Sequence, residues 1–163
     1  MTDAPAGDAV VCEISIDAPA SLVFELFTEP ALLVQWIGID ATLEPEAGGL
    51  FRFELVKGEF CSGRYLEVVP PRRVAFTWGW ESGALPVAPG STTVEVDLEE
   101  HDGVTRVRLA HRGLEAAMRP WHEDGWRRYL ERLAAVAEGR DPGVDPAAAY
   151  AGTGPPPAPP GTD

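Results

Sequence analysis

The longest helical pattern in the chain runs over residues 121–139. Apolar residues recur there at the three-and-four spacing of one helical face, and charged residues fall on the opposite face. Gly139 followed by Pro142 marks the end of the helix. At 1.5 Å per residue the helix is about 27 Å long, which is enough to cross a small sheet. The rest of the chain must therefore provide a surface that buries one face of this helix.

The predicted buried face of this helix carries two large rings, Trp126 and Tyr129, beside its Leu, Val and Ala residues. Aromatic side chains with a polar tip occur both in filled cores and in the walls of apolar pockets. Both interpretations, a filled core and one wall of a pocket, stay open at this point.

The sequence before this helix begins with one strand and two short helices. Residues 10–17 alternate apolar and polar side chains, which predicts a strand with one buried face. A short helix is expected after Pro19, and a second from Pro30 to Trp36, because proline is favoured at the first helical position.

Residues 39–113 show apolar alternation broken by turn residues, which predicts six further strands in an antiparallel meander. Residues 81–90, ESGALPVAPG, have no period and contain two prolines. We expect them to form a long hairpin loop at the rim of the sheet.

The length of 163 residues fits one domain, which we place at residues 10–139. Residues 1–9 are expected to be a flexible N-terminus. Residues 140–163 are rich in Pro, Gly and Ala and have little to bury, so they are expected to be a disordered tail. Removing this tail is expected to leave the melting temperature nearly unchanged.

The net charge is -13, from 26 acidic and 13 basic residues. This acidic balance argues against nucleic acid as a partner, because affinity for nucleic acid comes mostly from basic residues that neutralise phosphates. No apolar run is long enough for a membrane span, and no secretory signal is recognisable, so a cytoplasmic location is expected. Cys12 and Cys61 are expected to be reduced, since no CxxC or Cys/His group is present.

Few polar residues are candidates for chemistry. His111 falls on the inward side of its strand, where a hydrogen-bonded structural histidine is the usual case. His101 lies in a turn and His122 at a helix start, so we expect no metal site and no cofactor. The carboxylates fall mostly on outward positions, and no catalytic residue is assigned.

Five separated motifs resemble one family: IDAPASLVFELFTEPALLVQWIG, GGLFRFEL, GRYLEVVPPRRVAFTW, TRVRLAHRGL and the GW pair of the last helix. In this order they resemble the bacterial proteins named after the activator of Hsp90 ATPase, within the SRPBCC or START-like (Bet v 1-like) superfamily. The resemblance covers residues 10–139. It implies an α+β helix-grip fold, in which a curved antiparallel seven-stranded sheet wraps around a long C-terminal helix, with two short helices after the first strand.

The resemblance also implies a cavity between the sheet and the long helix that holds a hydrophobic small molecule or lipid, and it does not imply chaperone work. One departure is Ile37, at a position where the family often has a second Trp. Two other functions stay open. Polyketide cyclases and aromatases are related in fold and work mainly by shaping an apolar pocket, and the acidic surface suits a protein-interaction module. A homodimer is also a possible assembly.

The candidate ligand-binding residues are large rings and one imidazole on the apolar sides of their elements. A pocket is expected between the sheet and the start of the long helix, with Trp36 and residues 81–90 at its mouth. Tyr65 and Val68 can both point inward only if a β-bulge lies near Glu67. The full set is Trp36, Phe51, Phe53, Tyr65, Phe76, Trp78, His111, Trp126 and Tyr129.

Overall fold

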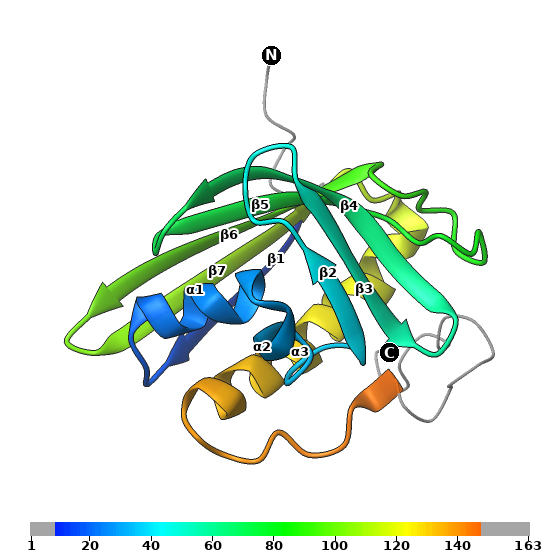
Figure 1. The fold of residues 1–163 in the computed structure, drawn as a ribbon. Coiled ribbons are helices and arrows are strands. Elements are labelled where there is room, and N and C mark those ends of the chain that lie inside the picture. The colour runs from blue at the N-terminus through cyan, green and yellow to red at the C-terminus, as the bar shows by residue number, and fades with distance from the viewer. Residues whose placement is uncertain (1–8, 148–163) are drawn as a thin grey trace.

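The computed structural model describes residues 9–147, which form a curved sheet around a long helix (Figure 1). Seven strands pair in the order β1-β7-β6-β5-β4-β3-β2, and every pair is antiparallel. This confirms the predicted helix-grip fold. The elements are β1 Ala9–Ile16, α1 Ala20–Thr28, α2 Pro30–Leu33, β2 Asp40–Leu43, β3 Leu50–Val56, β4 Glu59–Val69, β5 Arg73–Trp78, β6 Thr92–His101, β7 Val104–Arg112, the 3-10 helix η2 Ala116–Met118 and α3 Arg119–Ala137.

The long helix α3 begins two residues before the predicted start, with Pro120 in its first turn. At its other end, Gly139 adopts a positive φ of 78°. The Gly139 N–H donates to Val136 O and the Arg140 N–H donates to Ala135 O, which is the pattern of a Schellman cap. The helix thus ends near Gly139, as predicted, and these two backbone hydrogen bonds cap it.

The second short helix ends at Leu33, earlier than the predicted end at Trp36. The chain continues as a tighter turn, because the Trp36 N–H bonds to Leu33 O, three residues back. Residues 81–90 form the predicted long connection between β5 and β6 without helix or strand. Within it, Val87 is buried and its carbonyl accepts a hydrogen bond from the Trp80 N–H, so this loop is fastened to the core.

A register shift between Tyr65 and Glu67 interrupts the pairing of β4 with β5. Tyr65 is buried, Leu66 and Glu67 are exposed, and Val68 packs partly against the core. The bulge therefore returns Val68 to the side of Tyr65, which meets the condition that the sequence set for both residues to point inward.

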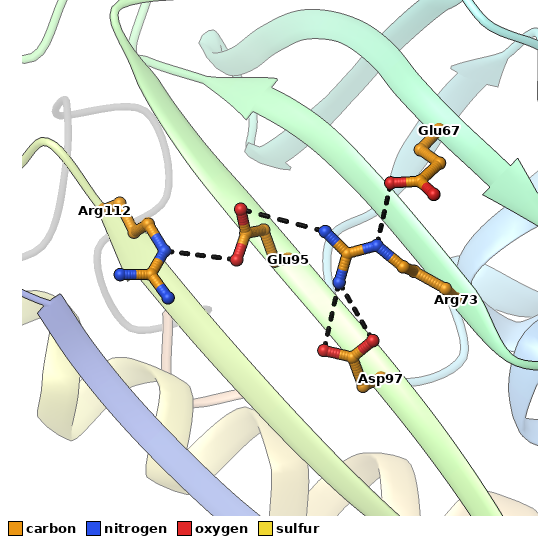
Figure 2. A network of polar contacts seen from close by, with 5 residues as sticks. All are labelled: Glu67, Arg73, Glu95, Asp97 and Arg112. Carbon is orange, nitrogen blue, oxygen red and sulfur yellow. Dashed lines mark hydrogen bonds and ion pairs between the residues drawn. The ribbon is translucent and has the colours of Figure 1, made fainter. Parts of the chain in front are cut away.

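The outer face of the sheet carries a network of ion pairs (Figure 2). The Arg73 side chain bonds to Glu67 at 2.8 Å and to Asp97 at 2.9 Å, and it approaches Glu95 at 3.8 Å. Arg112 bonds to the same Glu95 at 3.1 Å. Of the outward carboxylates that the alternation predicts, Glu95 and Asp97 are thus paired with arginines of neighbouring strands. Exposed pairs of this kind each contribute about 0–1 kcal/mol to stability.

Residues 140–147 belong to the segment predicted to be disordered, but they contact α3. The Tyr129 hydroxyl donates to Asp145, and the Arg132 guanidinium donates to the carbonyls of Pro142 and Gly143. Ala147 is buried at 2% exposure. The Asp145 side chain also accepts from the Ala147 N–H, and this bond forms a short turn. Amino-acid composition alone does not predict such a turn. The remainder of the predicted tail, 148–163, and residues 1–8 lie outside the described residues.

We expect two truncations to differ in stability. Ending the chain after residue 139 removes the acceptors of Tyr129 and Arg132, so the free energy of unfolding should fall by about 2 kcal/mol. Ending it after residue 147 should change the melting temperature little, because Asp145 and Ala147 are kept. Thermal unfolding of both variants beside the full chain measures the difference. Equal melting temperatures for the two truncations would contradict the packing of 140–147.

No helix among the described residues is both long and apolar enough to cross a membrane.

Candidate functional site

All nine candidate residues are buried on the inner side of the sheet, each with 9% or less of its surface exposed. Those that lie in strands share the inner face because alternate residues of a strand point to the same side of the sheet. Trp36 follows α2, and the others lie in β3, β4, β5, β7 and α3: Phe51, Phe53, Tyr65, Phe76, Trp78, His111, Trp126 and Tyr129.

The rings of the strands form one cluster that reaches α3, which we call the aromatic cluster: Phe51, Phe53, Phe76, Trp78 and Trp126. Phe51 and Phe76 stack with their centroids 3.9 Å apart. The ring of Trp78 lies 5.6 Å from that of Phe53 and 4.9 Å from that of Trp126. Such pairs contribute about 0.5–1.5 kcal/mol beyond the area they bury.

Trp36 and Tyr129 lie apart from the aromatic cluster. Trp36 packs edge-on against Phe27 and donates from its indole nitrogen to the Leu26 carbonyl at 2.7 Å. Tyr129 donates to Asp145, and burial raises the pKa of its hydroxyl. Tyr65 bridges the two regions, since its ring contacts Phe51 and its hydroxyl donates to the Phe27 carbonyl. The structure thus brings seven of the nine together and places Trp36 and Tyr129 at the edges.

His111 is part of a chain of hydrogen bonds inside the core. The Trp126 indole N–H donates to His111 Nδ1 at 3.0 Å. Nδ1 must then be unprotonated, so a neutral imidazole carries its proton on Nε2 and donates it to the Thr92 hydroxyl at 2.8 Å. Thr92 in turn donates to the Trp78 carbonyl at 2.9 Å. Every polar atom of this chain has a partner when His111 is neutral.

His122 is a buried polar residue that the sequence reasoning placed only at a helix start. Its Nε2 accepts from the Trp80 indole at 3.3 Å, and its Nδ1 donates to the Met118 carbonyl at 2.9 Å. Its ring lies 5.3 Å from that of His111. One signal was available in the sequence: His122 precedes Trp126 by four residues, which places both on one helical face.

Both histidines are held in the neutral form. Burial, with a further contribution from His122, lowers the pKa of His111 well below its ordinary value of 6.5. Burial lowers the pKa of His122 to about 4. A proton on His111 Nδ1 would also point at the N–H of Trp126, so protonation breaks that hydrogen bond. His111 therefore holds Trp126 and Thr92 in place through its two nitrogens, and with both nitrogens engaged it does not suit the role of a general base.

The backbone of α3 runs close to β1, and it makes at most isolated close approaches to β3, β4 and β5. The aromatic cluster fills the space between α3 and these strands. Within the cluster, the indole N–H of Trp78 is buried, and no acceptor among residues 9–147 lies within hydrogen-bond reach of it. The interior thus combines several apolar surfaces with one unsatisfied donor.

The outer face of the sheet carries a depression lined mostly by charged side chains. It holds arginines and carboxylates in equal number, and most of them pair with one another, as Arg106 does with Glu13. Such a surface offers an apolar ligand little contact. Its lining is Glu13, Glu67, Val69, Arg72, Arg73, Asp97, Leu98, Glu99, Arg106 and Arg108.

No group of three His, Cys, Asp or Glu side chains is arranged to hold a metal ion within the described part of the chain. Cys12 and Cys61 are both free and buried, and burial raises the pKa of each thiol. Reactive cysteines have lowered pKa values, so these two suit packing better than chemistry.

Comparisons with known proteins agree with the fold. Among solved structures, an AHSA1-like protein from Rhizobium etli is 45% identical with a TM-score of 0.68, over 85% of this chain and 86% of that one. DynU16, a protein of the dynemicin biosynthetic locus, is 25% identical with a TM-score of 0.71; the match covers 85% of this chain and only 50% of DynU16. The Aha1 dimer from Colwellia psychrerythraea shares the fold at 19% identity, with a TM-score of 0.69, over 80% of this chain and 96% of that one.

A comparison with curated proteins finds no match. The profile of the family described as "Activator of Hsp90 ATPase homolog 1-like protein" matches residues 17–138, which is most of the chain. With the 45% identity to the Rhizobium protein over most of both chains, this match shows that the chain belongs to the activator of Hsp90 ATPase homolog 1-like family.

Proposed function

We propose that this protein binds a hydrophobic small molecule or lipid between the inner face of the sheet and α3. The observation that carries the proposal is the aromatic cluster itself: side chains, and not backbone contact, bridge the space between α3 and strands β3 to β5. Ligand sites in proteins are mostly apolar and aromatic, with a few placed polar groups. The predicted lining residues supply both features.

A ligand must displace some of these rings. Phe51, Phe76 and Trp78 are each 4% exposed or less, so they present almost no surface to a ligand while they stay in place. Rings move between rotamers more readily than backbone hydrogen bonds break. Residues 81–90 offer a route, because this loop covers the core near Trp80 with Val87, and its backbone hydrogen bonds to β4 lie at its two ends, from the Glu81 N–H and the Gly90 N–H. We therefore expect binding to be coupled to a shift of the loop.

Binding is favoured over cyclase-like catalysis by the state of the polar groups. Both nitrogens of His111 are engaged inside the protein, and the Tyr65 hydroxyl donates to a backbone carbonyl. Burial also raises the pKa of Tyr65. Neither group is free to transfer a proton to a substrate without losing its structural hydrogen bond.

The first test is native mass spectrometry of the protein as purified, together with titration of the neutral fluorescent probe N-phenyl-1-naphthylamine. We expect a co-purified apolar compound, or saturable probe binding that the compound competes for. Leu66→Ala, on the outer face, should bind the probe as the parent does, since Leu66 is 50% exposed.

Absence of both a co-purified compound and probe binding would contradict the proposal, and a stable protein partner in pull-downs would then favour the interaction module. Turnover of a cyclisable poly-β-ketone that is lost on His111→Gln would favour the enzyme.

A further inference from the structure

We propose that the indole N–H of Trp78 is the polar anchor of the ligand site, and that it selects an apolar ligand carrying one uncharged hydrogen-bond acceptor, such as a ketone or ether oxygen. This inference rests on the proposed function and goes further by naming the ligand's chemistry. Trp78 is 4% exposed, and its Nε1 has no acceptor anywhere in residues 9–147. Buried indole donors usually have a partner.

The other indoles of this region are satisfied by the protein. Trp36 donates to a carbonyl at 2.7 Å, Trp80 to His122 at 3.3 Å and Trp126 to His111 at 3.0 Å. The backbone carbonyl of Trp78 is also satisfied, by the Thr92 hydroxyl. The unmet group is thus a single donor at the centre of the aromatic cluster, whose ring contacts reach both the strands and α3.

The surroundings of Trp78 restrict the acceptor to a neutral one. Six rings contact Trp78, and all of them are uncharged: Phe51, Phe53, Phe76, Trp80, Trp126 and the neutral imidazole of His111. No cation among them would compensate a buried carboxylate, which is costly to desolvate without a partner. A hydroxyl would accept the bond but bring a proton of its own that then needs an acceptor. A ketone or ether oxygen meets the donor and adds no new demand.

The experiment compares two small probes of nearly the same shape, 1-indanone, which has a carbonyl, and indane, which has none. Dissociation constants are measured for the parent and for Trp78→Phe, which keeps an aromatic ring and removes the N–H. We expect the preference for 1-indanone over indane to be about fivefold larger in the parent than in Trp78→Phe, as one net hydrogen bond predicts. Taking the ratio within each protein cancels the change in ring volume.

A spectroscopic measurement tests the same contact. The chain has five tryptophans, so its nitrogen–proton correlation spectrum holds five indole signals, and Trp78→Phe identifies one of them. We expect 1-indanone to move the Trp78 indole proton downfield, and indane to leave it near its original position. Trp121→Phe is the matched control, because Trp121 contacts Trp80 and His122 and not Trp78 among the ring pairs. It should keep the full preference of the parent.

The outcomes separate the inference from the proposed function. If both probes bind and Trp78→Phe retains the parent's preference, the anchor is wrong while an apolar site stands. If neither probe binds the parent, the proposed function itself fails for ligands of this size, and the anchor fails with it. The anchor is supported if 1-indanone moves the Trp78 indole proton downfield, Trp78→Phe loses the parent's preference for 1-indanone, and Trp121→Phe keeps it.

Discussion

Lowering the pH from 6.5 to 4.5 should cost the protein about 2 kcal/mol of its free energy of unfolding through His122, with a further loss in the same direction through His111. Both are neutral in the folded state, with the pKa of His111 well below 6.5 and that of His122 about 4. The unfolded chain takes up a proton on each histidine as the pH falls through 6.5. The stability they contribute is therefore fully present above pH 6.5 and is lost at about 1.4 kcal/mol per pH unit for each histidine.

The variants His122→Gln and His101→Gln isolate this effect. Glutamine offers an acceptor and a donor as His122 does, but it does not titrate, so the slope of stability against pH should fall by about 1.4 kcal/mol per unit. His101, whose side chain is 80% exposed at the β6–β7 turn, supplies the surface control for the substitution itself. Chemical denaturation at several pH values between 4.5 and 7 measures the slopes. Equal slopes for the parent and His122→Gln would contradict a buried neutral His122.

Several carboxylates titrate in a different window. The pKa of Glu81 is lowered by its hydrogen bonds with Arg52, and that of Glu138 by the backbone N–H of Asp17, so their stabilising effects are lost only as the pH falls below about 4.5. Burial raises the pKa of Glu59, so its protonation begins above 4.5 and opposes the loss there. The effects of Glu81 and Glu138 therefore lie below the histidine window, and comparing His122→Gln with the parent at each pH cancels the effect of Glu59.

Replacing Trp78 with alanine should lower the free energy of unfolding by about 3–5 kcal/mol, the usual cost of removing a large ring from a packed core. The ring of Trp78 contacts both Phe53 of β3 and Trp126 of α3, so its removal leaves a gap that borders both elements. The space that is left should accept indole, and a saturating concentration of indole should restore part of the lost stability.

Leu66→Ala is the matched control for Trp78→Ala, because it deletes a large apolar side chain that is 50% exposed on the same sheet. Its cost should stay within about 0.5 kcal/mol. Urea denaturation of the two variants, with and without indole, gives the comparison. A cost below about 1.5 kcal/mol for Trp78→Ala would mean that the ring borders open space in the ligand-free protein.

Much of the fold could be predicted because the patterns that carry it are local. The alternation of β3 and β5 places Phe51, Phe76 and Trp78 on one face, and the structure has them there. The bulge beside Tyr65 meets the condition under which Val68 also points inward, although the sequence did not decide whether the bulge forms. The end of α3 at Gly139 is a local signal of the same kind.

Other features depend on contacts between distant segments, which a local pattern does not carry. The packing of 140–147 rests on acceptors for Tyr129 and Arg132, and its composition alone indicated disorder. The hydrogen bond from Trp80 to His122 joins residues 42 apart in the chain. That the indole N–H of Trp78 lacks an acceptor can be recognised only from the three-dimensional positions of its neighbours.

The nine predicted ligand contacts stay a prediction, as do a homodimer and a cytoplasmic location. Size-exclusion chromatography with light scattering tests the assembly, and fractionation of cells tests the location. The family and the fold do not depend on either result.

The most direct test of the central claim is an isotope-filtered nuclear Overhauser measurement on the protein with bound 1-indanone. If the ligand lies between the sheet and α3, its protons should show contacts to the rings of Phe51, Phe76 and Trp126 together. Contacts only to residues of the outer face, such as Val69 and Leu66, would contradict the account, because they would place the ligand on the opposite side of the sheet.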